Sequence, residues 1–516
     1  MRQPLVLSLC LLGGATPALS QVGRLGTIEF PTSGSAMAQS HFLRGTLFLH
    51  SFEYDSAATE FRAAQQVAPG FAMAYWGEAM TYNHPVWDQQ DRPAALAALS
   101  RLAATPGERS AKASTRREQA WLHAVETLYG EGSKAHRDTV YERAMESIAK
   151  EWPADLEAQT FHALALLGLS RTTRVIPTYM RAGAIALDAM AKNPDHPGAA
   201  HYAIHAFDDP IHAALGLPAA RAYSRIAPGA AHAQHMTTHI FLALGMWDDV
   251  VRQNVIASGT DKVRWMPGHY TIWLGYGLLQ QGRFAAAADH LALVRRNMAE
   301  DESPGRRGAY LLMQSDFLVN AERWADSAAL ASVDAQGVGP VPLVVNAFAR
   351  GLAAFKLGDI ALARRQLDGI QSLNTSSTPI SAAQVLAREL QGLIRMSEGD
   401  SAGGIALLRE ATAIEDTLPM EFGPPAIVKP SHELLGEILL AQGKDSDARQ
   451  QFESALRLAP RRMRSLLGLS RAAFRGNNEE VARMSSHQLL DVMDQSDTTL
   501  TEKEEIRTML NALEHN

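Results

Sequence analysis

The stretch GTLFLHSFEYDSAATEFRAAQQVAP at residues 45–69 has a counterpart near the other end of the chain, GEILLAQGKDSDARQQFESALRLAP at residues 436–460. Both begin with glycine, both have the same length, and four further positions match: Ala57 and Ala448, Phe61 and Phe452, Ala64 and Ala455, and Pro69 and Pro460. Small residues let helices cross closely, an aromatic ring fills the next gap, and proline stops the second helix. The internal repeat therefore indicates an array of helical hairpins.

This framework resembles the tetratricopeptide repeat, a helix–turn–helix unit of about 34 residues. Shorter copies, each with a glycine turn and the same small-residue pattern, occur at four places: LGMWDDVV (244–251), QGRFAAAA (281–288), LGDIALAR (357–364) and SEGDSAGG (397–404). The resemblance covers most of residues 38–485, in roughly ten or eleven repeats. It implies an all-α fold, a right-handed α-solenoid, in which the first helix of each repeat lines a concave, ligand-binding surface.

Some segments depart from the repeat. Residues 86–150 and 170–190 leave the register, so we expect insertions or lengthened helices there. We expect a polar connector at 105–118, a proline-rich loop at 414–430 and a frayed tail after about residue 498. The expected organisation is a signal peptide at 1–20, an extended N-terminal segment at 21–37, an N-terminal repeat array with insertions at 38–250, a C-terminal array at 251–485, and a C-terminal helix or tail at 486–516.

Composition sets limits on the class of partner. The chain has 516 residues, of which 46% are hydrophobic, and a formal net charge of -7 at pH 7. That length can bury a large core. A mildly acidic chain lacks the basic surface typical of nucleic-acid binding, so we expect protein, peptide or small-molecule partners and no nucleic acid.

The first twenty residues, MRQPLVLSLCLLGGATPALS, have the pattern of a secretory signal. Arg2 precedes an apolar run from Leu5 to Leu12, and Ala18 begins a small-residue exit. The apolar run is too short for a membrane span; the alternative is a buried N-terminal helix. We expect a periplasmic or secreted protein. The only cysteine, Cys10, would be removed with the signal, which excludes disulfides and thiolate sites from the mature chain.

Histidines recur at the repeat spacing. Pro194 and Pro228 are 34 residues apart and match the closing proline, so helices should restart near Pro197 and Ala231. The first of these helices contains HYAIHAFDDP (201–210) and the second contains AHAQHMTTHIF (231–241). Two histidine pairs take equivalent places, the fifth and ninth, in successive repeats: His201 with His235, and His205 with His239. The resemblance assigns these places to the concave face.

Four imidazoles on two neighbouring helices could share one metal ion. Side chains four residues apart on a helix are about 6 Å from one another, and packed helices lie about 8–10 Å apart. At about 100° per residue, His232 falls within about 60° of His235 and His239, so it joins the candidate ligands. Asp208 or Asp209 could be a fifth ligand, could orient an imidazole, or could act as a base on bound water.

Histidine nitrogens together with a carboxylate, and without sulfur, suit zinc, copper, iron, manganese or nickel. Two other interpretations stay open: hydrogen-bonded histidines in a polar groove, and a site for an organic ligand or peptide.

Further candidate ligand-binding residues lie along the expected groove. The segment AMAYWGEAMTYNHPVW (72–87) is rich in large side chains, which form either core or a ligand contact. Glu433 and Glu437 repeat the fifth and ninth places near the C-terminus, where they form either a solvated face or part of a site. The full set is Trp76, Met80, Asn83, His84, His50, His269, Tyr276, Glu433 and Glu437.

Familiar catalytic motifs are absent from the sequence. HELLG at 432–436 begins like a zinc-protease helix, but Gly436 stands where the second histidine is needed. Three function classes remain: an exported binding protein with a metal-loaded histidine cluster, a metal-dependent hydrolase or oxidoreductase using Asp208 or Glu433 as base, and a protein–protein scaffold without metal.

Overall fold

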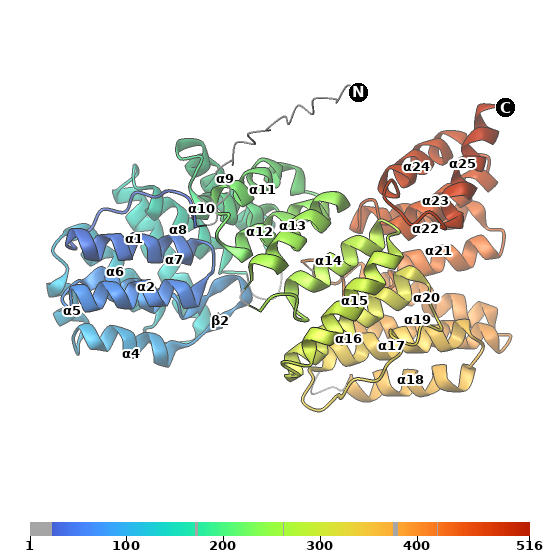
Figure 1. The fold of residues 1–516 in the computed structure, drawn as a ribbon, viewed down its shortest axis with the longest axis horizontal. Helices are drawn as coiled ribbons and strands as arrows, with labels where there is room; N and C mark the ends of the chain where they lie inside the picture. The colour runs from blue at the N-terminus through green and yellow to red at the C-terminus, as the bar shows by residue number, and fades with distance from the viewer. Residues whose placement is uncertain (1–22, 171–173, 262, 375–379, 421, 516) are drawn as a thin grey trace, which may run out of the picture.

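A computed structural model describes residues 23–170, 174–261, 263–374, 380–420 and 422–515 (Figure 1). The expected signal peptide, residues 1–20, lies outside the described residues. Successive α-helices pack against one another along the chain, so the all-α expectation is confirmed. The strands found in the described ranges are two short ones, which pair antiparallel: β1 (Asn83–His84) and β2 (Gln89–Gln90).

The N-terminal helices begin after an extended segment, as expected. Their bounds are α1 Ala36–His50, α2 Tyr54–Val67, α3 Ala72–Met80, α4 Arg92–Leu102, α5 Pro106–Lys112, α6 Arg116–Leu128, α7 Lys134–Glu151, α8 Leu156–Leu167, α9 Ile176–Lys192, α10 Pro197–Phe207, α11 Ala213–Ile226, α12 Ala231–Ala243 and α13 Trp247–Thr260. The predicted restarts near Pro197 and Ala231 are confirmed.

The remaining helices continue the array, and α13 packs directly against α14. Their bounds are α14 His269–Gln280, α15 Phe284–Met298, α16 Pro304–Ala321, α17 Pro340–Lys356, α18 Ile360–Leu373, α19 Ser381–Ser397, α20 Ser401–Glu415, α21 Ser431–Ala441, α22 Asp445–Leu458, α23 Met463–Arg475, α24 Glu479–Val492 and α25 Thr501–Glu514. In Figure 1, α12–α14 lie between an N-terminal group of helices and a C-terminal group.

The sequence repeat corresponds to one packing unit. Phe61 of α2 is fully buried against glycines of the two flanking helices, Gly45 and Gly77. Phe452 of α22 lies in the same way between Gly436 and Gly468. A Cβ atom at Gly45 would approach the Phe61 ring to 2.8 Å, and one at Gly436 would approach Phe452 to 2.9 Å, closer than real Cβ atoms come. Glycine is thus needed at these crossings because a ring occupies the Cβ position.

Two expectations were wrong. The segment 105–118 is largely helical, since capping boxes at Thr105–Glu108 and Thr115–Glu118 begin α5 and α6. The chain after residue 498 forms α25, which buries Ile506 and Leu510, so most of it does not fray. Both segments are polar in composition, but caps and a buried face determine their structure.

The C-terminal array returns to the middle of the chain. Trp247 of α13 donates an indole hydrogen bond to the carbonyl of Arg461, 2.9 Å away. Arg462 donates to the hydroxyl of Tyr276 in α14, with an Nη1–Oη distance of 3.0 Å. Repeats some 200 residues apart are therefore in direct contact next to the histidine-bearing helices.

None of the helices in the described ranges combines the length and the apolar character needed to cross a bilayer.

Candidate metal centre

Three successive first helices, α10, α12 and α14, present imidazoles to one another. The ligand atoms of His201, His205 and His232 lie within 4.8 Å of one another, and we call these residues the first triad. The same limit holds for His235, His239 and His269, the second triad. His205 and His239 link the triads, with ring centroids 6.0 Å apart.

The expected grouping therefore differs from the observed one. We expected the fifth- and ninth-place pairs of α10 and α12 to share an ion. Instead, His232 at the second place of α12 faces back to α10, whereas His235 and His239 face forward to His269 of α14. His232, His235 and His239 span about 60° around α12. This spread is enough for the ring at one edge to face α10 while the others face α14.

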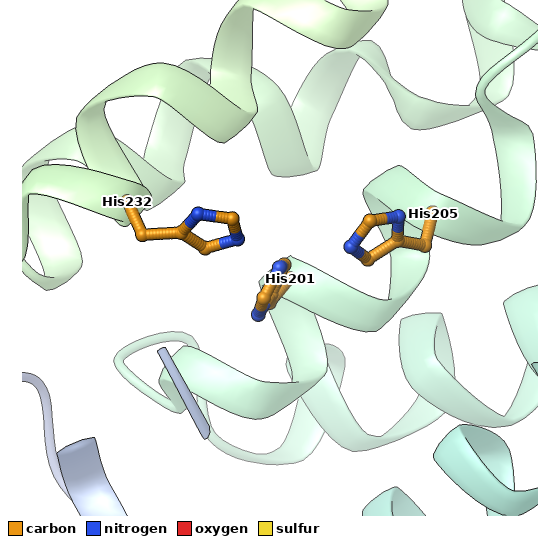
Figure 2. A group of neighbouring side chains, drawn as sticks. All are labelled: His201, His205 and His232. Atoms are coloured by element: carbon orange, nitrogen blue, oxygen red, sulfur yellow. The ribbon is translucent and has the colours of Figure 1, made fainter. Parts of the chain in front are cut away.

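The first triad is buried and has unused ring nitrogens (Figure 2). His201 donates from Nδ1 to the backbone carbonyl of His50, 2.7 Å away, which leaves a lone pair on Nε2. The Nε2 atoms of His201, His205 and His232 are buried and have no hydrogen-bond partner among the residues that the structure describes. Figure 2 shows the three rings gathered around a common space. Three buried ring nitrogens that face a common space and lack a partner in the described part of the protein are available to bind a ligand together.

Hydrogen bonds set the protonation of the second triad. His235 Nδ1 lies 2.8 Å from Oδ1 of Asn254, whose amide nitrogen donates to the Val250 carbonyl and so fixes the amide orientation. His239 Nδ1 lies 2.5 Å from Oδ2 of Asp208. Each Nδ1 therefore carries the proton in the neutral ring, and each Nε2 presents a lone pair.

Those two lone pairs face each other, because Nε2 of His235 and Nε2 of His239 are 3.1 Å apart. A cation between the nitrogens would remove the repulsion between these lone pairs. For N–metal bonds of about 2.0–2.1 Å in a tetrahedron, two ligand nitrogens lie about 3.3 Å apart. The observed separation is close to that edge length.

The electrostatic environment favours neutral rings. Burial lowers the pKa of His201, His205, His232 and His235 well below 6.5, and neighbouring imidazoles lower each of these values further. His269 is exposed on one side, yet surrounding protein and His239 lower its pKa to about 3. Neutral imidazole is the form that binds a metal.

A third group close by, His50, Glu157 and His196, also has ligand atoms near enough to one another to hold an ion, but its members pair with each other as ions. His50 contacts the Glu157 carboxylate at 2.7 Å through Nε2 and the Tyr202 hydroxyl at 2.9 Å through Nδ1. His196 lies 3.0 Å from the other Glu157 oxygen. Burial alone would raise the pKa of Glu157, but the two histidines lower it to about 2. His50, predicted to bind a ligand, belongs to this buried ion network, and neither Glu157 nor His196 was singled out from the sequence.

The two aspartates have different roles. Asp208 holds His239, which matches the expected orienting role rather than that of a fifth ligand. Asp209 instead pairs with Arg174 at 3.0 Å and with His212 at 2.9 Å, and belongs to neither triad. Because proline at 210 ends the helix, the two carboxylates leave the helix in different directions.

The other N-terminal candidate residues, Trp76, Met80, Asn83 and His84, belong to neither triad. Trp76 packs in an aromatic core with Phe30 and Trp121 and is fully buried, so it is part of the core and not a ligand contact. Met80 and Asn83 border a cavity of about 20 Å³, room for about one water. His84 stacks on Tyr54, ring centroids 3.9 Å apart, beside a separate cavity of about 570 Å³.

The C-terminal candidates form a buried ion network. Glu433 accepts hydrogen bonds from Arg462 at 2.8 Å and from Ser465 at 2.6 Å. Although burial opposes ionisation, Arg462 and Lys429 hold the pKa of Glu433 well below its usual value. Glu437 pairs with Lys429, and Tyr276 accepts from Arg462. The solvated face is wrong for Glu433, which is fully buried and pairs with the cations of Arg462 and Lys429.

One wall of the second triad was not apparent from the sequence. Trp273 of α14 lies over His239, with centroids 4.4 Å apart, and packs edge-on against His235 at 4.7 Å. The proline-rich loop also touches this indole, since Gly423 has no room for a Cβ beside Trp273. That loop also borders a cavity of about 180 Å³, which reaches Asp208.

Comparisons with known proteins agree with the repeat. Residues 434–486 match the family model described as tetratricopeptide repeat. No curated protein matches the chain. Similar solved structures include yeast Tom70 (10% identity, 92% of this chain and 95% of that chain, TM-score 0.30). A human IFIT1 dimer with m7Gppp-AAAA shows 11% identity over 90% of this chain and 91% of that chain, with a TM-score of 0.36. TM-scores this low carry no argument about function.

Proposed function

Since this chain carries tetratricopeptide repeats, we propose that it is a solenoid protein that binds transition-metal ions at the first and second triads. The observation that carries the proposal is the close approach of Nε2 of His235 and Nε2 of His239, 3.1 Å apart, while Nδ1 of each ring faces a side-chain oxygen. The unsatisfied Nε2 atoms of the first triad support a second ion.

The donor set narrows the choice of metal. Imidazole nitrogens suit zinc, copper and iron, whereas manganese prefers oxygen ligands. Three histidines with one orienting carboxylate resemble the ligand sets of zinc sites that keep a fourth position for water or substrate. When bound, such an ion acts as a Lewis acid or lowers the pKa of bound water.

In the wider setting, we propose export to the periplasm or the cell exterior and binding of a protein, peptide or small molecule in the concave groove. The first twenty residues, with Arg2 before a short apolar run, support export. The tetratricopeptide fold is a common protein-interaction scaffold.

A metal-dependent hydrolase or oxidoreductase is the second candidate. The observation that favours it is the exposed side of His269, because catalytic sites keep an open position whereas structural sites are closed. Asp208 would then keep His239 oriented, and the ring nitrogens would keep their tautomers throughout turnover.

The proposal is tested by metal analysis of purified protein after loading with zinc, copper or iron. We expect close to one ion per triad. Replacing His201 and His232 by alanine should remove one ion, and replacing His235 and His239 should remove the other, with helical circular dichroism retained. His123→Ala, a change at an exposed histidine outside the triads, is the matched control.

Metal content well below one ion per chain under all three loadings would refute the proposal and leave the protein–protein scaffold. A cooperative loss of helix in the alanine variants without metal loss would instead assign the histidines a structural role.

A further inference from the structure

The two triads differ in access. All three residues of the first triad are at most 8% exposed, and His235 and His239 are 0% and 6% exposed. His269 alone among the six is exposed. The ring of His269 therefore offers the most direct approach from outside to a bound ion.

A cavity lies on that path. It has a volume of about 420 Å³, within the usual range for small-molecule sites. Its wall includes one imidazole from each triad, His232 and His269, and three large aromatic side chains, Trp87, Trp265 and Tyr270. Trp87 belongs to the 3-10 turn Pro85–Trp87 and lies 6.1 Å from the His232 ring, centroid to centroid.

Trp265 is held in an unusual conformation. Its φ of 59° lies in the left-handed region, which costs a bulky residue of the order of 1–2 kcal/mol. The side-chain amide of Asn297 donates to the Trp265 carbonyl over 3.2 Å and so helps to maintain that conformation. Backbone strain of this kind clusters at ligand sites, and here it accompanies an indole that lines the cavity.

The described residues of the cavity wall include charges of opposite sign. Asp261 and Arg306 both line the cavity. Arg306 is partly committed, because its Nη1 donates to the Pro267 carbonyl at 2.8 Å. Among the described residues of the wall, one charge of each sign and three aromatic rings favour a flat, uncharged body over an anion or a cation.

We propose that this cavity binds a small aromatic molecule, which stacks between Trp87 and Trp265 and directs a nitrogen or oxygen donor past His269 to the metal of the second triad. This inference rests on the proposed metal binding. The ligand it implies is compact and aromatic and has a single donor atom, and the exposed ring of His269 makes the second triad the more accessible of the two.

The experiment compares two probes, 4-phenylimidazole and imidazole. Each is titrated into the cobalt-loaded full-length protein, and binding is followed through the visible absorption bands of cobalt. Both probes have the same donor nitrogen, and 4-phenylimidazole adds a phenyl ring that fits against an indole. We expect it to bind about tenfold more tightly than imidazole. In Trp265→Ala the tenfold advantage should vanish, with imidazole affinity unchanged.

Two further variants strengthen the test. Trp87→Ala changes a 46% exposed side chain, so it should fold even if Trp265→Ala does not, and it should also reduce the advantage of the phenyl ring. Trp324→Ala, which lies outside the cavity lining, is the matched control and should leave both affinities unchanged.

Equal affinities for the two probes, or an undiminished phenyl advantage in both cavity variants, would overturn the inference. Cobalt content is measured on the same samples. Failure to take up cobalt would count against the proposed function, whereas normal cobalt uptake without a phenyl preference would count against this inference alone.

Discussion

Asp208 offers a test of the second triad in which no ligand is removed. Its carboxylate accepts a charge-assisted hydrogen bond from Nδ1 of His239, and both groups are buried. In Asp208→Asn the acceptor remains but its charge is lost, so the bond loses roughly half its strength. Changes to such orienting partners lower metal affinity by about 10–100-fold, which corresponds to about 1.4–2.7 kcal/mol.

Competition with a chromophoric zinc chelator measures this change. One of the two expected sites should weaken by that factor in Asp208→Asn, and the other should keep its affinity, because Asp208 contacts no residue of the first triad directly. Asp209→Asn is the matched control, since Asp209 is equally buried and pairs with Arg174 and His212. Unchanged binding in Asp208→Asn, or an equal loss in both variants, would refute the reasoning.

Three further outcomes are expected. Gly468→Ala places a methyl group on the buried Phe452 ring and should lower the free energy of unfolding by about 1–3 kcal/mol in urea titration, whereas Gly305→Ala, with open space around it, should change it by less than about 0.5 kcal/mol. Glu157→Gln removes the carboxylate from two buried histidines and should cost about 3–5 kcal/mol of stability, with metal content unchanged; a loss of metal would contradict the separation of this network from the triads. The metal-free protein should lose stability as the pH falls from about 7 to about 5. Burial holds the folded pKa values of five triad histidines below their unfolded value of about 6.5: His201, His205, His232, His235 and His269. The unfolded chain therefore binds more protons, and each of these histidines adds a slope of up to about 1.4 kcal/mol per pH unit. A flat thermal-unfolding profile over this range would contradict the buried, neutral state of these rings.

The 34-residue repeat explains which parts of the fold and of the candidate site could be predicted from the sequence. Proline spacing placed α10 and α12 correctly, and the 34-residue recurrence of histidine placed the rings on facing surfaces of successive first helices. It could not show that His232 would turn toward α10 and His235 toward α14. That division depends on how neighbouring helices are rotated about their axes, and this rotation is set by side-chain packing over the whole array.

Two residues that complete the second triad could not be predicted from the sequence, because their positions also depend on how the helices pack. Asn254 orients His235 from the second helix of the hairpin, and Trp273 covers the rings from α14, but neither has a sequence signal that differs from an ordinary core residue. The error at 105–118 was avoidable, because Thr-x-x-Glu occurs there twice.

The sharing of rings between consecutive hairpins has a consequence for biosynthesis. Neither triad is contained in one hairpin, since the first spans α10 and α12 and the second spans α12 and α14. A nascent chain that has emerged only as far as α13 would hold three histidines together but leave the other pair without its third member. The second triad would then form only after α14 has left the ribosome and docked, so early capture of an ion there by an incomplete chain is disfavoured.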